Sequence, residues 1–305
     1  MALESEFPTS FGNELLGLVR ERGIVPAPAV KPVQPRSGYE HLHKKPLPSA
    51  PLAVAVDIYG TLLASAVGEP GTAFPPDMAA RLREFVDADH ALAKAQGIIW
   101  PEVDAISIFA RVLEQNGSDS SREAAAMACA RWECASNPCS AMPGAARFLA
   151  LCREMHLPLG LVSNAQFYTS YFVEAAFGVP LFPADTGNAV LGETMEQPGK
   201  VGNLGFDPDL ALWSYRTGRA KPDRWMFDEL ASRMAGRGIP PERVLYVGND
   251  ALNDCACAGE AGFMAALFGG DERSFKPRLE EARVLSTPPS TFIRSWDELG
   301  RLLCI

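Results

Sequence analysis

The sequence predicts an α/β fold with a mostly parallel sheet. Short apolar runs recur along the chain and end in polar or turn-forming residues: 52–57, 157–164, 210–214, 244–250 and, as a fifth, 263–268. Segments with the periodicity of amphipathic helices separate them, among them residues 143–155 and 223–235. Such runs indicate strands that are covered on both faces, as in a parallel sheet flanked by helices. The carboxyl ends of these strands meet at one edge, where ligands bind.

The stretch from residue 64 to residue 142 interrupts this alternation. It contains three helical patterns with no strand between them: Met78–Gln96, Pro101–Gln115 and Ser120–Ala135. A connection between a strand and a helix usually takes about 2–6 residues, so this stretch is too long to be a simple loop. We predict a helical subdomain that is inserted after the first strand and overhangs the polar edge of the sheet.

Residues 1–50 differ in composition from the rest of the chain. They hold seven of the 25 prolines, which favours an extended arm with one short amphipathic helix near residues 12–22. The predicted organisation is therefore a Pro-rich N-terminal arm (1–50), an α/β core (51–63 and 143–305) and a helical cap (64–142).

Charge and composition argue against several classes of function. The 305 residues contain 28 Lys and Arg against 37 Asp and Glu, and the net charge of −9 disfavours binding to nucleic acid or to an anionic membrane. No apolar run approaches the roughly 20 residues that cross a bilayer, and the N-terminus lacks the pattern of a secretory signal. The seven cysteines lack the spacing of zinc sites, which favours reduced thiols. We expect a soluble, cytoplasmic protein, and the pattern specifies no oligomeric state.

Four polar segments follow the predicted strands. They are Asp57-Ile58-Tyr59-Gly60-Thr61, Ser163-Asn164, Lys221-Pro222-Asp223 and the pair Asp250 and Asp254. In order, residue type and position, they resemble the four motifs of the haloacid dehalogenase-like hydrolase superfamily. The resemblance covers roughly residues 52–270. It implies a Rossmann-like core, and the helical insertion lies where that family carries its first-type cap.

The resemblance also implies a catalytic mechanism. Asp57 corresponds to a nucleophile that attacks phosphorus and forms an acyl-phosphate, which divides one difficult hydrolysis into two easier steps. Lys221 would neutralise the charge on the nucleophile and on the phosphoryl group. Ser163 and the backbone N–H groups of Gly60 and Asn164 would donate hydrogen bonds to the phosphoryl oxygens, and Thr61 belongs to the same substrate-binding turn as Gly60.

The same resemblance implies a magnesium ion and a small phosphorylated metabolite as substrate. Mg²⁺ is usually held by one or two carboxylates, a carbonyl oxygen and waters. Asp57 and Asp250 would be the carboxylates and the carbonyl of Tyr59 the backbone ligand. Asp254 would hold a metal-bound water or orient Lys221.

Tyr59 departs from the motif of the family's phosphatases. Those enzymes carry a second aspartate two residues after the nucleophile, as general acid and then base. A tyrosine has an ordinary pKa of about 10, so at neutral pH it can donate a proton but is a poor base. Its presence predicts slow turnover of an aspartyl-phosphate, and Tyr59 could still contribute to catalysis as a donor.

The motifs therefore leave three functions open. The string Asp-x-Tyr-Gly-Thr is also that of the family's 2-haloacid dehalogenases, in which the aspartate attacks carbon, halide leaves without a proton and no metal takes part. Those enzymes lack the acid at Asp250 and carry a tyrosine where this chain has Phe227. Arg81 and Arg83 lie in the region that supplies their carboxylate-binding arginine, but a solvated helix face explains both more simply.

On these grounds the sequence favours a Mg²⁺-dependent phosphatase, with a metal-independent dehalogenase as the alternative. A member that binds a phosphorylated ligand without turnover, because Tyr59 replaces the acid–base aspartate, is the third interpretation.

Overall fold

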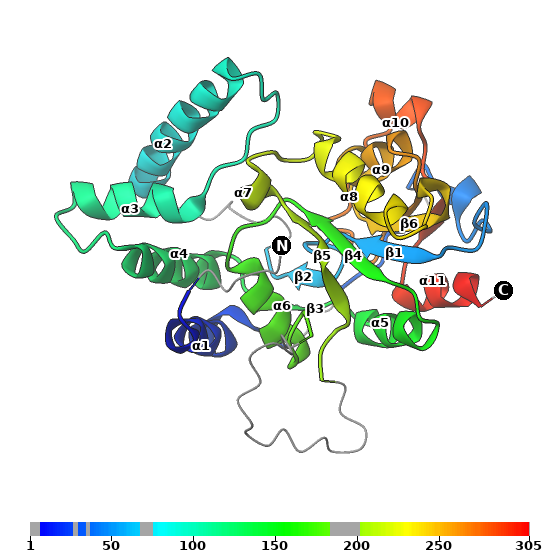
Figure 1. The fold of residues 1–305 in the computed structure, drawn as a ribbon, viewed down its shortest axis with the longest axis horizontal. Coiled ribbons are helices and arrows are strands. Elements are labelled where there is room, and N and C mark those ends of the chain that lie inside the picture. The colour runs from blue at the N-terminus through cyan, green and yellow to red at the C-terminus, as the bar shows by residue number, and fades with distance from the viewer. Residues whose placement is uncertain (1–6, 27–29, 35–36, 68–75, 184–201, 305) are drawn as a thin grey trace.

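A six-stranded, fully parallel sheet forms the centre of the protein (Figure 1). The structure is a computed structural model that describes residues 7–26, 30–34, 37–67, 76–183 and 202–304. The strand order is β5-β4-β1-β6-β7-β8. The strands are β1 (Ala53–Val56), β4 (Leu159–Ser163), β5 (Phe206–Trp213), β6 (Val244–Gly248), β7 (Met264–Phe268) and β8 (Thr291–Ile293).

Helices cover both faces of this sheet, because the strands are apolar on both sides. Val54 and Val56 of β1 pack with α5 (Ala145–Glu154), α6 (Thr169–Phe177) and α11 (Trp296–Leu303). The alternate residues of β1, Ala53 and Ala55, pack in a second cluster. That cluster also contains residues of α8 (Trp225–Ala235), a π-helical turn (Ala251–Ala256), α9 (Cys257–Glu260) and α10 (Ala282–Ser286). The predicted α/β class and mostly parallel sheet are confirmed.

Three helices lie between two short strands that follow β1. The strands β2 (Leu63–Ser65) and β3 (Cys139–Ala141) pair with each other in antiparallel fashion. Between them the chain forms α2 (Pro76–Ala95), α3 (Ala105–Gln115) and α4 (Arg122–Ser136), which lie to one side of the sheet in Figure 1. Asp104 and Ser121 cap α3 and α4 by accepting a hydrogen bond from a backbone N–H of the first turn.

The N-terminal segment joins these inserted helices to the core. Helix α1 (Thr9–Leu18) continues into a π-helical turn (Val19–Gly23) that contacts both α4 and α6. Further along, a 3-10 turn (Glu40–Leu42) follows Tyr39, and both Tyr39 and Leu42 are buried. The Tyr39 hydroxyl donates to the carbonyl of Pro277 at 2.7 Å. The described part of residues 1–50 therefore packs against the rest of the protein.

Several elements differ from the sequence-based expectations. Strand β5 begins at Phe206 rather than at residue 210, and it contains Pro208, which an edge strand tolerates because one side needs no hydrogen bonds. The three-residue strands β2, β3 and β8 were not expected. The remaining connections are α7 (Ser214–Thr217) and a 3-10 turn (Pro241–Arg243). Of the helices that the structure describes, none is both long and apolar enough to cross a membrane.

A buried carboxyl group links the inserted helices to the core. Glu133 of α4 accepts hydrogen bonds from the Asn137 amide at 2.7 Å and from the Tyr168 hydroxyl at 3.2 Å. Burial raises the pKa of Glu133 above 4.5, although these two hydrogen bonds oppose the shift. The folded protein therefore holds this proton more tightly than the unfolded chain does.

Replacing Glu133 by glutamine removes this pH dependence. Because the folded pKa of Glu133 is raised, its ionisation destabilises the fold as pH rises from about 4.5 through that pKa. In chemical denaturation, the free energy of unfolding of Glu133→Gln relative to wild type should increase between pH 5 and pH 8. The increase should be about 1.4 kcal/mol for each unit by which the pKa is raised. The exposed Glu114→Gln of α3 is the control, and an equal increase in both variants would contradict the prediction.

Candidate active site

The polar ends of the central strands meet at one cavity. Asp57 follows β1, Asn164 follows β4, and Asn249 and Asp250 follow β6, and these three strands are neighbours in the sheet. The cavity has a volume of about 280 Å³. It is lined by Asp57, Tyr59, Asn164, Lys221, Asn249, Asp250, Asn253, Asp254, Ser274 and Lys276.

The side chain of Lys221 connects the acids of this cavity. Its Nζ lies 2.8 Å from Asp57 Oδ1 and 2.6 Å from Asp254 Oδ1. It also lies 3.2 Å from the carbonyl oxygen of Val162 and 3.3 Å from the hydroxyl of Tyr246. Lys221 is 6% exposed and Asp254 1% exposed, so water screens these ion pairs very little. The ammonium group therefore compensates two buried carboxylates at once.

The protonation states of this cluster follow from burial and charge. Burial alone would lower the pKa of Lys221, but the adjacent Asp254 and Asp57 outweigh it and raise that pKa above its usual range. Burial raises the pKa of Asp254 to about 7, while Lys221 opposes the shift. Lys221 is therefore charged at neutral pH, and Asp254 is a carboxylate whose basicity is higher than usual.

The backbone of Lys221 is held by Asn164. The Asn164 amide accepts from the N–H of Lys221 at 2.7 Å and donates to its carbonyl at 3.0 Å. This paired contact joins the end of β4 to the loop that carries the lysine. Asn164 was expected to bind substrate through its backbone N–H, and its side chain has this positioning role in addition.

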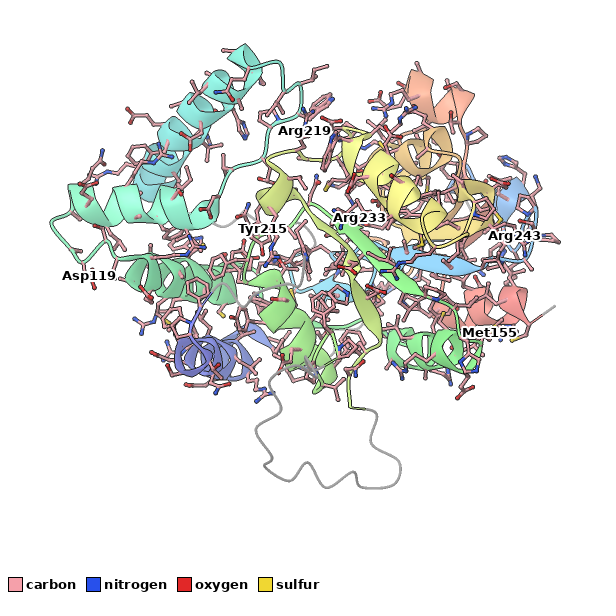
Figure 2. All side chains as sticks on the ribbon, viewed as in Figure 1. Asp119, Met155, Tyr215, Arg219, Arg233 and Arg243 are labelled. Atoms are coloured by element: carbon pink, nitrogen blue, oxygen red, sulfur yellow. The ribbon has the colours of Figure 1, made fainter. Side chains whose placement is uncertain are left out.

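The loop that carries Lys221 is also tied to the inserted helices. The N–H of Glu102 donates to the carbonyl of Gly218 at 3.1 Å, and the N–H of Ala220 donates to the carbonyl of Trp100 at 2.8 Å. The Ser214 hydroxyl donates to the Glu102 carboxylate at 2.7 Å. Arg219, which Figure 2 labels between α7 and α8, lies within this contact. The connection between α2 and α3 is thereby attached to the residues that precede Lys221.

The turn after Asp57 has a tight geometry. Gly60 has a φ of +79°, and a Cβ atom there would collide with the Asn249 amide, so both conformation and space require glycine. The Gly60 N–H donates to the carbonyl of Leu63 at 2.8 Å, and Thr61 is fully buried with its hydroxyl 3.4 Å from Asn249 Oδ1. In this conformation neither residue lines the cavity, although both were expected to contact substrate.

Tyr59 lines the cavity, but its hydroxyl is engaged outside the acid cluster. Its phenol oxygen lies 3.1 Å from the hydroxyl oxygen of Thr169 in α6 and shares a hydrogen bond with it. Burial, with Glu133 as the next contributor, raises the pKa of Tyr59 well above its usual value of 10.0. The phenol is therefore neutral at physiological pH and cannot act as a base.

Asp250 occupies the N-terminus of the π-helical turn that follows β6. Its Oδ1 accepts from the N–H groups of Leu252 and Asn253 at 2.9 and 3.1 Å, and its Oδ2 is 3.1 Å from Nη2 of Arg278. Its neighbour Asn249 packs against the turn after Asp57. The Asn249 amide is thus the group after β6 that contacts the turn following Asp57. The Asp250 carboxylate was the group expected to face Asp57.

These contacts determine whether the expected magnesium ligands fit a metal. Asp250 is bound by two N–H groups and a guanidinium, and Asp254 by Lys221 and the N–H of Asp250 at 2.9 Å. Among the described residues, no group of three or more His, Cys, Asp or Glu side chains is arranged to hold a metal. Magnesium needs several oxygen ligands, including at least one accessible carboxylate. In this arrangement the carboxylates of Asp250 and Asp254 are engaged by other groups and do not fit such a site, whereas Asp57 and Tyr59 line the cavity.

Ser163 was expected to donate a hydrogen bond to the substrate. It ends β4, and within the described residues its buried hydroxyl has no hydrogen-bond partner. A buried hydroxyl without a partner is costly, but Ser163 does not line the cavity around Asp57, although it was expected to contact substrate.

Several residues that line the cavity or contact its side chains were not predicted as site residues. Tyr246 of β6 donates from its hydroxyl to the carbonyl of Val162 at 2.7 Å and supports Lys221. Asn253 and the loop residues Ser274, Lys276 and Arg278 were also not selected. The position of that loop after β7 was the available signal, since β7 is parallel to β6 and ends at the same edge.

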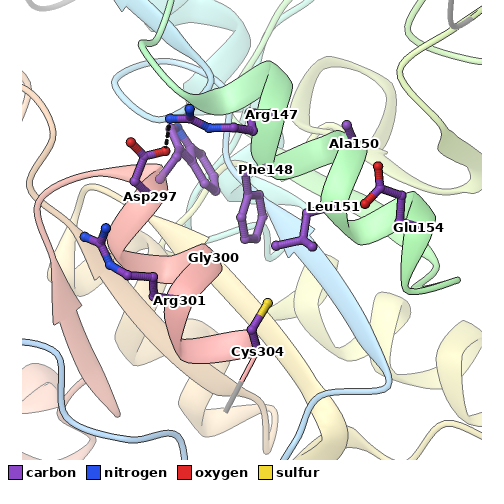
Figure 3. A pocket seen from close by; sticks show the side chains of 10 residues that line it. Arg147, Phe148, Ala150, Leu151, Glu154, Asp297, Gly300, Arg301 and Cys304 are labelled. Atoms are coloured by element: carbon purple, nitrogen blue, oxygen red, sulfur yellow. Dashed lines mark hydrogen bonds and ion pairs between the residues drawn. The ribbon is translucent and has the colours of Figure 1, made fainter. Parts of the chain in front are cut away.

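A second cavity lies between α5 and α11 (Figure 3) and has a volume of about 480 Å³. An ion pair between Arg147 and Asp297 lies on its wall, together with the exposed Cys304. It contains none of the motif residues, and the cavity around Asp57 remains the candidate active site.

Removing the Lys221 charge should damage the fold as well as activity. Lys221→Met leaves the Asp57 and Asp254 carboxylates buried side by side, and we expect the free energy of unfolding to fall by about 3–5 kcal/mol. Urea denaturation at pH 7.5 measures this loss. Adding Asp254→Asn should restore part of the stability but no activity, because one of the two charges is then removed. The exposed Lys94→Met of α2 is the control, and an equal effect of Lys94→Met and Lys221→Met would contradict the role of this ion pair.

Comparisons with known proteins identify the family of this chain. The family model described as haloacid dehalogenase-like hydrolase matches residues 51–262. No curated protein matches the sequence. A solved structure similar to this one is the 2-haloacid dehalogenase from Pseudomonas syringae pv. Tomato DC3000, at 16% identity and a TM-score of 0.50, covering 83% of this chain and 97% of that one.

Two further solved structures show the range of similar proteins. The L-2-haloacid dehalogenase from Xanthobacter autotrophicus with chloropropionic acid covalently bound has 18% identity and a TM-score of 0.46, covering 83% of this chain and 98% of that one. The putative hydrolase YfnB from Bacillus subtilis bound to magnesium has 15% identity and a TM-score of 0.44, covering 84% and 100%. At 16% identity, the similarity to the Pseudomonas syringae structure shows the fold alone. Because the family model spans most of the chain, the protein belongs to the haloacid dehalogenase-like hydrolases.

Proposed function

We propose that this hydrolase attacks a carbon atom with Asp57, without a metal ion, and releases halide from a small 2-haloacid. The observation that carries the proposal is the source of positive charge at the site. Lys221 compensates Asp57 and Asp254, and Arg278 compensates Asp250. Protein cations thus pair with all three carboxylates, and a magnesium ion would have to displace the groups that already engage Asp250 and Asp254.

Tyr59 supports the same chemistry. Phosphate-ester hydrolysis benefits from an acid that protonates the leaving oxygen, whereas a departing halide needs no proton. Tyr59 is neutral and its hydroxyl is bonded to Thr169, so it is poorly suited to shuttle protons at Asp57. It is better suited to form part of the wall that encloses the substrate.

The reaction is a double displacement. A carboxylate oxygen of Asp57 attacks the carbon that carries the halogen, the carbon–halogen bond breaks, and halide leaves with the bonding electron pair. Water then attacks the carbonyl carbon of the Asp57 ester, which releases a hydroxy acid and restores the carboxylate. We assign Asp254 as the base for this water, because its raised pKa, about 7, suits proton transfer near neutral pH.

The helices α2–α4 have the position of a cap in this proposal. They follow β2 directly after the Asp57 turn, and their connection 100–102 is bonded to the loop before Lys221. A helical cap there would exclude water from the ester until hydrolysis and would contribute to the choice of substrate.

A second candidate is hydrolysis of a small phosphorylated metabolite through an aspartyl-phosphate on Asp57. The polarity of the cavity favours it, since Asn164, Asn253, Ser274 and two lysines in its wall can donate hydrogen bonds to phosphate oxygens. Participation of magnesium would require Asp250 to exchange Arg278 for the ion.

A substrate panel with and without chelator distinguishes these functions. Purified protein is incubated with 2-chloropropionate or with 4-nitrophenyl phosphate, in EDTA or in magnesium chloride, beside an Asp57→Asn control. We expect Asp57-dependent halide release that EDTA does not reduce. Phosphate release that requires magnesium, without halide release, would establish the second candidate instead. A stable adduct on Asp57 in mass spectrometry, without product, would identify a ligand-binding protein without turnover.

Substitutions at Tyr59 test its role separately. If Tyr59 only encloses the substrate, Tyr59→Phe should lower kcat for halide release by less than about tenfold, which corresponds to 1.4 kcal/mol. Thr169→Val, which removes the other hydroxyl of this hydrogen bond, is the matched control. A loss of more than a hundredfold in Tyr59→Phe alone would assign a proton-transfer role to the phenol. Tyr59→Asp should raise phosphatase activity if the acid–base group is what the site lacks.

A further inference from the structure

The loop after β7 forms one wall of the active-site cavity and places a lysine there. Ser274 and Lys276 line the cavity together with Asp57. The N–H of Lys276 donates to the carbonyl of Asn249 at 3.0 Å, and its carbonyl accepts from the N–H of Ala251 at 2.9 Å. These two bonds lie on either side of Asp250, so the backbone of Lys276 is fixed relative to the end of β6.

The rest of this loop is braced against the site. Asp271 is buried and its carboxylate binds Arg273 at 2.7 Å, while Arg273 also donates to the carbonyl of Ala66 at 2.9 Å. The Asn249 amide donates to the carbonyl of Ser274. The wall that carries Lys276 is therefore positioned before substrate binds, and such preorganisation favours selective binding.

Lys276 adds a positive charge to a cavity that contains three aspartates. Lys221 forms ion pairs with Asp57 and Asp254, and Arg278 forms one with Asp250. An anionic substrate that approaches these carboxylates meets like charges, which opposes binding unless the wall also carries cations. Lys276 contributes one of these cations, from a separate loop.

The two arginines in the sequence region that supplies the carboxylate-binding arginine of the family's dehalogenases were expected to lie on a solvated helix face, and both are exposed. Arg81 and Arg83 are exposed on α2, and Arg81 donates to the Asn116 side chain at 3.2 Å. Neither residue lines the cavity around Asp57. A carboxylate next to the reacting carbon therefore needs a partner from the core rather than from these positions.

We propose that Lys276 is a specificity-determining residue, whose ammonium group binds the carboxylate of the substrate while Asp57 attacks the adjacent carbon. This inference rests on the proposed function, because that function puts the reacting carbon at Asp57. In this inference the loop after β7 binds the charged group of the substrate, and residues at the ends of β1 and β6 carry out the reaction.

Binding to a protein that cannot react tests the inference directly. In the Asp57→Asn background, calorimetry measures binding of 2-chloropropionate and of the uncharged 2-chloropropionamide. Adding Lys276→Met should weaken binding of the carboxylate about 10- to 100-fold, as expected for loss of a hydrogen bond to a charged group, and leave the amide unchanged. Lys276→Arg should retain most of the affinity. The exposed Lys45→Met, in the same background, is the control.

The outcomes separate this inference from the proposed function. Unchanged binding of 2-chloropropionate to the Lys276→Met protein overturns the inference, as does Lys276-dependent binding of inorganic phosphate without any binding of the carboxylate. If the carboxylate binds in a Lys276-dependent way but the enzyme with Asp57 intact releases no halide, the inference is supported and the proposed function fails. If halide is released and Lys276→Met changes neither KM nor kcat, the function stands and the inference fails.

Discussion

The contact of Lys221 with Asp57 and Asp254 is the interaction on which this site depends. Asp57 follows β1 and Asp254 belongs to the turn after β6, and the parallel pairing of these strands brings both carboxylates to one edge. Two unit charges 4 Å apart interact by about 4 kcal/mol at an effective dielectric constant of 20, so this topology is unfavourable without an intervening cation. The ammonium group of Lys221, which lies within hydrogen-bond distance of both carboxylates, stabilises this arrangement.

The surrounding structure serves to hold this lysine. Asn164 binds both backbone polar groups of Lys221, and Tyr246 contacts its ammonium group from β6. The segment 100–102 forms backbone hydrogen bonds with Gly218 and Ala220, which precede Lys221, and the Glu102 carboxylate accepts a hydrogen bond from Ser214. A displacement of α2 and α3 would therefore change the position of Lys221. This connection gives the inserted helices a direct physical route to the charge at Asp57, in addition to any contact with substrate.

Sequence patterns predicted the core of this structure well, and the details of the site less well. Strands β1, β4 and β6 were identifiable because they are apolar on both faces, while β8 has three residues and no distinctive pattern. At the end of β6, successive side chains point in different directions, so a shift of one position changes which residue faces the turn after Asp57. Asp250 had the expected residue type, but it caps the following turn, and Asn249 contacts Gly60 instead. Lys276 and Arg278 belong to none of the four motifs, and the sheet order brings Lys276 to the cavity around Asp57 and Arg278 to Asp250.

The source of the cations decides which chemistry the three aspartates can perform. A metal ion polarises the leaving oxygen of a phosphate ester and can exchange its ligands, so it suits a reaction in which negative charge develops on several oxygens. Lysine and arginine side chains instead provide fixed charges on a framework of backbone hydrogen bonds. Fixed charges suit a small anionic substrate whose orientation must be set before a single carbon is attacked. With Lys221 at Asp57, Arg278 at Asp250 and Lys276 in the adjacent wall, the positive charges are distributed as the proposed displacement at carbon would require.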